Sequence, residues 1–343
     1  MKRAICFFIL TLTCATCYAQ DIHWSQPSNA LLYLNPAFAG IEARYNVGLN
    51  FRDQWNVAGK TYRTYMVAAD CRIKSIGIGG LVHSDLSADG RYKTTSAGIT
   101  LSGLVKVNKH ARFGLGAGAN FMQNSLSADI FKWGSQFNGE SYDPTMPSGE
   151  ARTAATNHFF DLNAGVSFMY DADQSSMFTN RQRKLIAGYS INHITRPDMA
   201  LTGGTDQLIM KHTGYLKALL PLRDNLSLAP VVLLHYQGVL MEVTGGVLAR
   251  YTRGQTSRVT GNRKGSAFSF GAMYRLRDAI IPTFELEKGN SIFAFSYDIN
   301  ISSFSRVSKL RGGVELSIRL KAPKEPPADK KRPAKKKKGR RWF

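Results

Sequence analysis

The sequence predicts an all-β protein, a transmembrane antiparallel β-barrel of about 14 strands. Two observations predict this class. Apolar residues alternate with small or polar residues in many segments of about ten residues, and short connections alternate with long ones along the first half of the chain. About ten residues is the length that a tilted membrane-crossing strand needs. An apolar face opposite a polar face suits a lipid-facing wall around a polar lumen.

The alternation is clearest at residues 44–52, where one face carries Tyr, Val, Leu and Phe and the other carries Arg, Asn and Gly. A period of two residues indicates a strand. The same period recurs at 113–121, 161–170, 293–301 and 313–320. By this pattern we expect strands near 42–52, 61–73, 76–84, 92–107, 111–122, 159–171, 183–193, 211–220, 225–236, 238–251, 265–276, 278–287, 290–301 and 311–321.

The connections between these segments give a second line of argument, because outer-membrane barrels have short periplasmic turns and longer external loops. We expect short turns at 74–75, 108–110 and 222–224, and long connections at 52–60, 85–91, 123–158 and 194–210. The segment 252–263 is long where a periplasmic turn is expected, so the pattern allows two strands more or fewer. An even number of strands leaves both termini in the periplasm.

A soluble β-sandwich is the alternative, since it also contains short alternating strands. The polar faces here are rich in glycine, the apolar faces carry Phe, Tyr, Leu and Val in strand after strand, and no linker divides the chain before its tail. These features favour the barrel. Closure has a physical reason, because lipid cannot satisfy an unpaired backbone edge.

Composition divides the chain into four parts. Residues 1–19 have a basic start, an apolar run and a small residue at Ala19, as in a cleaved export signal. Residues 20–41 are a periplasmic, plug-like lead-in, and 42–321 form the barrel. Residues 322–343 are expected to be a disordered basic periplasmic tail. From Lys321 onward there are eleven Lys and Arg and two acidic residues, so this stretch contributes +9 of the net charge of +21.

The lead-in contains Trp24 and an apolar cluster at 31–34, followed by turn residues at Asn35, Pro36 and Gly40. Two hypotheses remain open for it. The segment could plug or line the periplasmic mouth of the barrel and bury its apolar residues against the inner wall. Alternatively, it is a hydrophobic lead-in that packs locally.

The sequence offers no constellation typical of an enzyme, metal site or cofactor site. Seven histidines are scattered without zinc spacing, and removal of the signal leaves Cys71 as the one cysteine. The glycine run at 114–118 lies within an alternating strand, so inward glycines in a crowded lumen explain it better than a phosphate loop does. A set of charged residues should face the lumen and pair with each other and with water rather than select a solute: Arg44, Arg52, Asp70, Arg72, Asp161, Glu242, Arg250, Asp298, Glu315 and Arg319.

Several short motifs resemble a known family. The run YLNPAFAG at 33–40 follows the signal closely, the segment 48–55 ends in Arg-x-Gln-Trp, and further pieces follow in order at 160–165, 188–197, 274–275, 296–299 and 312–317. Together they resemble the PorP/SprF family of type IX secretion system membrane proteins over roughly residues 20–321. The motif residues singled out by this resemblance are Asn35, Pro36, Ala37, Phe38, Gly40, Arg52, Gln54, Trp55, Arg196, Pro197, Tyr297, Asp298, Gly313 and Glu315.

The resemblance implies a non-enzymatic outer-membrane barrel of the type IX secretion and gliding machinery. It also implies partners, namely periplasmic ring and lipoprotein components and a secreted or surface-attached cargo protein, with no nucleic acid. The alternative is a porin-like solute channel, in which the loop 123–158 would either fold inward or stand outward for docking. The tail bases Lys335, Lys336, Lys337, Lys338, Arg340 and Arg341 either bind an acidic partner or lipid electrostatically or remain solvated.

Overall fold

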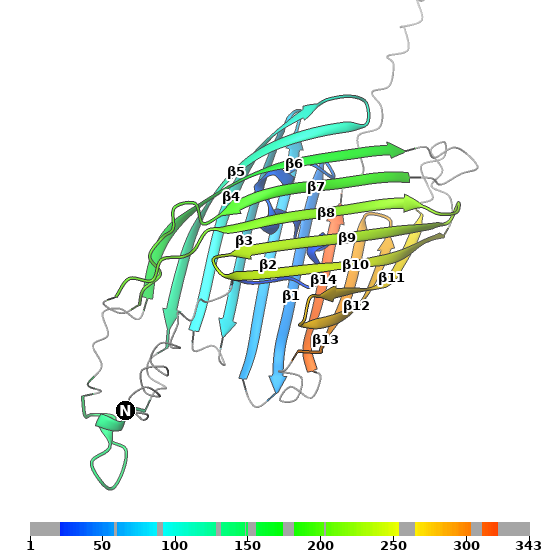
Figure 1. Cartoon of the computed structure of the whole chain (residues 1–343). Helices are drawn as coiled ribbons and strands as arrows, with labels where there is room; N and C mark the ends of the chain where they lie inside the picture. Colours follow the sequence, from blue (N-terminus) through cyan, green and yellow to red (C-terminus); the bar gives the residue numbers. More distant parts are fainter. Residues whose placement is uncertain are drawn as a thin grey trace, which may run out of the picture.

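Fourteen antiparallel strands form one closed barrel in the computed structural model of the chain, which confirms the predicted fold class and strand number (Figure 1). The structure describes residues 21–57, 60–87, 92–127, 132–147, 149, 156–173, 182–201, 204–253, 265–302 and 311–321. The expected signal peptide, 1–19, and the expected tail, 322–343, lie outside these residues.

Each strand pairs with its neighbours in the sequence, and β1 pairs with β14 to close the barrel. Each of the fourteen segments predicted from alternation overlaps one strand. The strands are β1 (Tyr45–Val57), β2 (Lys60–Ile73), β3 (Ile76–Ser87), β4 (Tyr92–Lys106), β5 (Ala111–Leu126), β6 (Thr156–Asp173), β7 (Gln182–Asn192), β8 (Lys211–Pro221), β9 (Leu226–Gln237), β10 (Leu240–Arg253), β11 (Ser266–Arg275), β12 (Ala279–Lys288), β13 (Ser291–Asn300) and β14 (Arg311–Lys321). The short helices are η1 (Pro27–Asn29), α2 (Leu31–Leu34), η2 (Pro36–Phe38) and η3 (Gly134–Gln136).

The barrel has two rims that differ in their connections. We call the rim where β1 begins and β14 ends the terminal rim, and the opposite one the loop rim. The connections 127–155 and 193–210 both lie at the loop rim, because they follow the odd-numbered strands β5 and β7. Four of the connections at the terminal rim are short turns, at 74–75, 107–110, 222–225 and 289–290.

Two of the predicted long connections are wrong. Val57 pairs with Lys60, so 52–60 is mostly strand, and β3 continues to Ser87, which pairs with Tyr92, so the second connection shortens to 88–91. The alternation fades at a barrel rim because outward positions there become polar too. Asp53 and Arg63, for example, face each other across β1 and β2 and form an ion pair of 3.4 Å. Backbone pairing thus continues beyond the last apolar residue.

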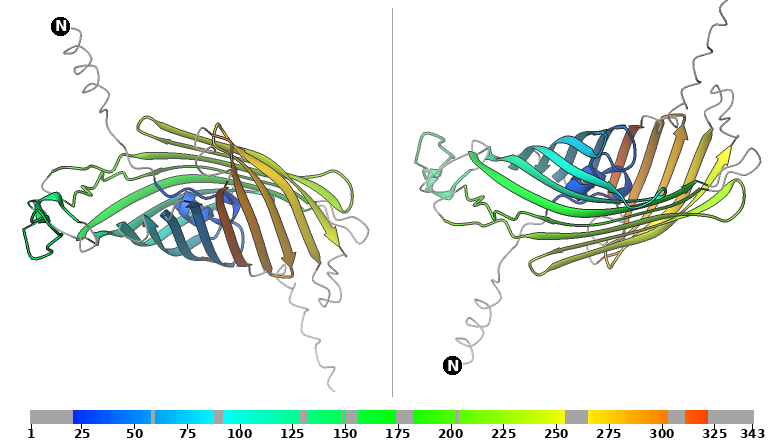
Figure 2. Two further views of the ribbon diagram at one scale, coloured as in Figure 1. Left: turned by 90° about the horizontal axis from the view of Figure 1, so that it is seen from below. Right: turned by 90° about the horizontal axis from the view of Figure 1, so that it is seen from above.

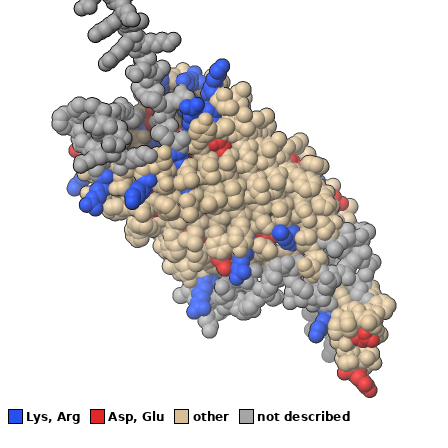
Figure 3. All heavy atoms as spheres, turned by 180° about the vertical axis from the view of Figure 1, so that it is seen from behind, with Lys and Arg blue, Asp and Glu red and all other residues tan. Residues whose placement is uncertain are grey.

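The outer wall is apolar, as a lipid-facing surface requires. Leu101, Phe284 and Ile318 are typical, with 40–56% of the side chain exposed on strands at different points around the barrel. Figure 3 shows a broad wall with few charges between two charged edges. Aromatic pairs lie near both rims, with Tyr251 and Phe268 at the terminal rim and Phe121 and Phe160 at the loop rim. Within the described ranges, no helix is both long and apolar enough to span a bilayer.

Residues 21–44, here called the lumenal segment, lie inside the barrel. Both views in Figure 2 show its short helices, in dark blue, between opposing walls. Trp24 is 1% exposed and Ala37, Ala39 and Ile41 are fully buried. Asp21 contacts Lys211 at the start of β8, whereas Glu42 contacts Lys321 at the end of β14. The segment therefore runs through the lumen from the loop rim to the terminal rim before β1 begins. The two ends of the described chain, Asp21 and Lys321, lie at opposite rims, which differs from the expectation that both termini lie on the periplasmic side.

The outward position of Leu101 predicts a depth-dependent cost of charge. Leu101→Arg should lower the free energy of unfolding by about 2–4 kcal/mol, because it places a charge at mid-wall, whereas Val107→Arg, just beyond the end of β4, should cost about 0–1 kcal/mol. Denaturant titration of the barrel in phospholipid vesicles measures both. Equal costs at the two positions would show that this wall does not face hydrocarbon.

Candidate functional site

The contact between the lumenal segment and the inner wall is the candidate site, and its most strongly charged part centres on Arg52. Arg52 Nη2 lies 2.7 Å from Asp298 Oδ2, and Arg52 Nη1 lies 3.1 Å from Glu315 Oε2. A second guanidinium, that of Arg275, lies 3.1 Å from the same Asp298 oxygen. Two cations and two carboxylates are thus buried together, which is the arrangement that buried charges require.

The lumenal segment completes this cluster. Glu315 accepts hydrogen bonds from the backbone N–H groups of Ser25, at 2.6 Å, and Gln26, at 3.1 Å. The Ser25 hydroxyl donates to Asp298 at 2.6 Å and accepts from Arg52 and Arg275. Ser25 therefore satisfies polar atoms that the wall alone leaves unpaired.

The YLNPAFAG run forms a second contact, centred on Asn35. Its side-chain oxygen accepts from the Ala37 N–H at 2.8 Å and thereby caps η2. Its side-chain nitrogen donates to the carbonyls of Val166, on β6, and Tyr189, on β7, at 2.9 and 3.1 Å. Pro36 occupies the first turn of η2, where its missing N–H costs nothing. One amide thus fixes the turn and attaches it to two neighbouring strands.

Three wall serines recognise the backbone of the same run. Ser190 donates to the Leu34 carbonyl at 2.6 Å, Ser167 to that of Ala37 at 2.8 Å, and Ser102 to that of Ala39 at 2.7 Å. These serines were not singled out in the sequence. The available signal was their place on the polar face of an alternating strand, which many other residues share.

Glycines in the wall let the run approach closely. A Cβ at Gly116 would collide with the backbone of Ala37, and one at Gly165 would collide with the Asn35 side chain. The glycine run at 114–118 thus relieves crowding in the lumen, as inferred from the sequence.

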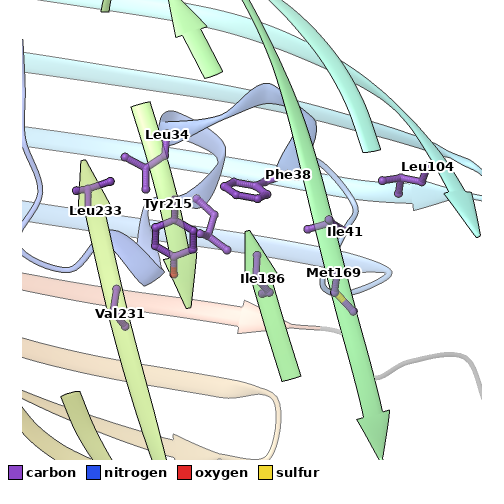
Figure 4. Packing of buried hydrophobic residues seen from close by; sticks show 10 residues of the cluster. Leu34, Phe38, Ile41, Leu104, Met169, Ile186, Tyr215, Val231 and Leu233 are labelled. Atoms are coloured by element: carbon purple, nitrogen blue, oxygen red, sulfur yellow. The ribbon is translucent and has the colours of Figure 1, made fainter. Parts of the chain in front are cut away.

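Apolar side chains of the segment pack against an apolar patch on the inner wall. Leu34, Phe38 and Ile41 belong to one buried cluster with Leu31, Leu104, Met169, Ile186, Tyr215, Val231 and Leu233 (Figure 4). The rings of Phe38 and Tyr215 meet edge to face, with centroids 5.7 Å apart. The sequence pattern predicts a polar lumen and gives no place to this patch. Its signal is the run from 229 to 234, Ala-Pro-Val-Val-Leu-Leu, which is apolar on both faces.

Ion pairs hold both ends of the lumenal segment. At the loop rim, Asp21 Oδ2 lies 2.7 Å from His193 Nε2, and Asp161 Oδ2 lies 2.9 Å from His193 Nδ1. Burial lowers the pKa of His193, but the two carboxylates outweigh burial and raise that pKa to about 9. At the terminal rim, Glu42 lies 2.6 to 3.2 Å from Lys184, Arg319 and Lys321.

The structure brings some of the motif residues together and separates others. Arg52, Asp298 and Glu315 form the charged cluster; Gln54 lies beside Arg52, and Gly313 pairs with Gln54. Asn35, Pro36, Ala37, Phe38 and Gly40 line the second contact, where Gly40 has φ +67° and its N–H donates to Asp70 at 2.9 Å. Trp55 falls on β1, but its side chain is outside the described part of the structure.

Three motif residues lie elsewhere. Arg196 and Pro197 belong to the connection between β7 and β8, where Arg196 is exposed, and Tyr297 occupies an outward position on β13. Lys335, Lys336, Lys337, Lys338, Arg340 and Arg341 lie outside the described residues.

The charged residues expected in the lumen pair largely as predicted, but many of them pair with the lumenal segment as well as with each other. Arg250 and Glu287 form a wall pair of 2.7 Å, whereas Arg319 binds Glu42 of the segment. Arg44 is exposed and lies over the Tyr45 ring at 5.4 Å.

The buried histidine of the site is held between two carboxylates. Both ring nitrogens of His193 already contact carboxylates, so neither is free to take a proton from a nucleophile. Among the residues that the structure describes, no group of three or more His, Cys, Asp or Glu could hold a metal ion. The arrangement positions the lumenal segment and neutralises charges around it.

These features define a class, a membrane-type β-barrel whose lumen holds its own N-terminal segment. The chain belongs to the family of type IX secretion system membrane proteins PorP/SprF, whose match covers residues 16–320. This confirms the resemblance seen in the sequence. No curated protein matches the chain.

Several solved structures match most of the chain at low identity. The toluene transporter TbuX of Ralstonia pickettii is 11% identical, with a TM-score of 0.49 over 86% of this chain and 94% of that one. The Pseudomonas putida toluene transporter TodX is 12% identical, with a TM-score of 0.47 over 85% and 92%. The KdgM porin is 6% identical, with a TM-score of 0.35 over 81% and 99%.

The buried position of Arg52 predicts a large effect of its removal. Arg52→Ala should lower the free energy of unfolding by about 3–5 kcal/mol, because Asp298 and Glu315 would lose a buried cation. Arg63→Ala is the matched control, since that side chain is 49% exposed and its pair with Asp53 should contribute about 1 kcal/mol or less.

Denaturant titration in vesicles measures both Arg variants. Hydrogen exchange of residues 24–30 then reports whether the lumenal segment has loosened. Similar costs for Arg52→Ala and Arg63→Ala would contradict a central role for the Arg52 cluster.

Proposed function

We propose that this type IX secretion barrel is a non-enzymatic docking component, which holds periplasmic partner proteins and a secreted or surface-attached cargo at the outer membrane. The observation that carries the proposal is the occupied lumen. A solute channel needs an open path, whereas residues 21–44 run from rim to rim and bind the wall along their length. The surfaces outside the lumen then remain for contacts with partner proteins.

The described loop 132–147 is the surface that we assign to docking of the secreted or surface-attached cargo. It projects from the loop rim (Figure 1). Its own contacts hold it: the Gln136 side chain donates to the Met146 carbonyl at 2.9 Å, Phe137 forms a bridge with Tyr142, and Lys132 lies 5.1 Å from the Tyr142 ring. Phe137 is 54% exposed at the same time. An ordered loop that displays an aromatic residue is typical of a protein-binding surface.

Affinity purification tests docking directly. The barrel, tagged within the β10–β11 connection at the other rim, should recover secretion-ring lipoproteins or a large secreted protein after gentle detergent extraction. Phe137→Ser should reduce the recovery of the secreted or surface-attached protein about tenfold, the effect of losing an interface hot spot, and should leave the recovery of periplasmic lipoproteins unchanged. Val239→Ser is the matched control, because Val239 is a 77% exposed apolar residue in the β9–β10 turn of the loop rim, the rim that also carries Phe137.

The outcomes of this experiment separate the hypotheses. Recovery of the barrel alone, intact and abundant, would overturn the docking proposal and favour the channel. Recovery with both Phe137→Ser and Val239→Ser at the level of the unaltered chain would keep docking but exclude the loop as its surface. If both variants lost partners equally, general damage at the loop rim would explain the result.

We also propose an orientation. Residues 1–19 are a signal that is removed after Ala19, and the terminal rim faces the periplasm together with the tail 322–343, its bases at 335–338 and 340–341 serving as an electrostatic contact. The support is that the two longest connections lie at the opposite rim, as external loops do in outer-membrane barrels.

Cysteine labelling tests the orientation. In a Cys71→Ala background, Val239→Cys at the loop rim should react with a membrane-impermeant maleimide in intact cells. Ser75→Cys, exposed in the β2–β3 turn of the terminal rim, should react only after the outer membrane is permeabilised. The reverse pattern would overturn the orientation, and the intact mass of the purified chain reports cleavage after Ala19.

A further inference from the structure

The terminal rim carries basic residues directly beyond the apolar outer wall. Arg183 begins the outward row of β7, Arg253 ends that of β10 and Lys288 ends that of β12. All three are exposed. Two residues away on the same strand, each has an outward apolar or aromatic neighbour: Leu185 for Arg183, Tyr251 for Arg253 and Leu286 for Lys288. Since side chains two apart share a face of a strand, these bases point away from the lumen.

Arg223, exposed in the β8–β9 turn, falls between Arg183 and Arg253 around the barrel. Strands β7 to β12 are consecutive neighbours, so the four bases form an arc of about 24 Å at the usual strand spacing. We call Arg183, Arg223, Arg253 and Lys288 the basic arc.

Carboxylates do not neutralise this arc. In the part of the chain that the structure describes, none of its four side chains is within ion-pair distance of an acid. Glu287 forms an ion pair with Arg250, and Glu42 forms one with Lys184. Asp224, next to Arg223, already has a partner. The loop rim differs, because its exposed bases are mixed with exposed acids such as Glu140, Asp198 and Asp206.

The depth of the basic arc in the membrane determines which part of the lipid it contacts. Tyr251 and Phe268 form an aromatic pair with centroids 5.2 Å apart, just inside Arg253. Aromatic side chains of this kind mark the boundary between hydrocarbon and headgroups. A base two residues farther out on the same face lies at the level of the lipid phosphates.

We propose that the basic arc binds the phosphates of anionic glycerophospholipids in the leaflet at the terminal rim. The four unneutralised bases, and the outward direction of the rows that carry Arg183, Arg253 and Lys288, support this assignment. A protein partner approaching along the barrel axis would instead meet inward or axial side chains. The proposal does not depend on the docking role proposed above.

Native mass spectrometry of the full chain in a neutral detergent provides the test. The probe is an equimolar mixture of phosphatidylglycerol and phosphatidylcholine with the same acyl chains, and the readout is the ratio of the two lipids retained. The unaltered chain should retain an excess of phosphatidylglycerol. Replacement of Arg183, Arg253 and Lys288 by Gln should lower the ratio about tenfold or more, and salt should lower it in the unaltered chain.

A matched variant separates the arc from net charge. Replacement of Lys93, Arg277 and Arg311 by Gln removes two Arg and one Lys from the loop rim and should leave the ratio unchanged. Heat-modified mobility in gels checks that both variants are folded. The same measurement on a chain ending at Lys321 removes the tail bases, and a clear excess of phosphatidylglycerol should persist there.

Four results would overturn the proposal. The first is equal retention of the two lipids by the unaltered chain, and the second is an equal fall in both triple variants. The third is complete loss of preference when only the tail is removed. The fourth comes from a second mixture, of phosphatidylglycerol with lipid A: stronger retention of lipid A would assign the arc to the other leaflet's lipid.

Discussion

The structure depends on the burial of two carboxylates at the seam where the barrel closes. Arg52 on β1 is paired in register with Glu315 on β14, and its guanidinium also binds Asp298 on β13. Two carboxylates in a buried site are costly unless cations and hydrogen-bond donors surround them. Arg52 and Arg275 supply the cations, and Ser25 and Gln26 supply donors from the lumenal segment. Barrel closure and insertion of the segment therefore stabilise each other.

The wall recognises the segment mainly through its backbone. Serines on β4, β6 and β7 donate to three carbonyls of the run from Leu34 to Ala39, and glycines leave room for that run to approach. Backbone recognition of this kind requires a fixed chain path, which Asn35 and Pro36 impose by capping and starting η2. The constraint on the motif is thus one of shape, while the wall carries the matching small and hydroxyl residues.

The strands could be predicted because alternation is a local property of the sequence. The site could be predicted only in part. Arg52, Asp298 and Glu315 stood out as lumenal charges, but their meeting depends on the pairing of β1 with β14, some 260 residues apart, which no local pattern encodes. The inner apolar patch was missed because Val231 and Leu233 alternate with the equally apolar Val232 and Leu234, so neither face looked lumenal. The strand ends at 53–57 and 85–87 were missed because polar residues occupy both faces near a rim.

Withdrawal of the lumenal segment would be costly, and this bears on how the barrel works. Exposing Trp24, Leu34, Phe38 and Ile41 to water would lose about 1.5–3 kcal/mol for each side chain. Removing Ser25 and Gln26 would leave Glu315 with fewer donors in a buried site. The ion pairs of Asp21 and Glu42 would also have to break at opposite ends of the barrel. Since these costs fall together, an open lumen is disfavoured in the isolated chain, and a partner that opened it would need to compensate all of them. A role carried by the rims and the outer wall needs no such compensation, which is why the docking proposal suits this fold better than a channel does.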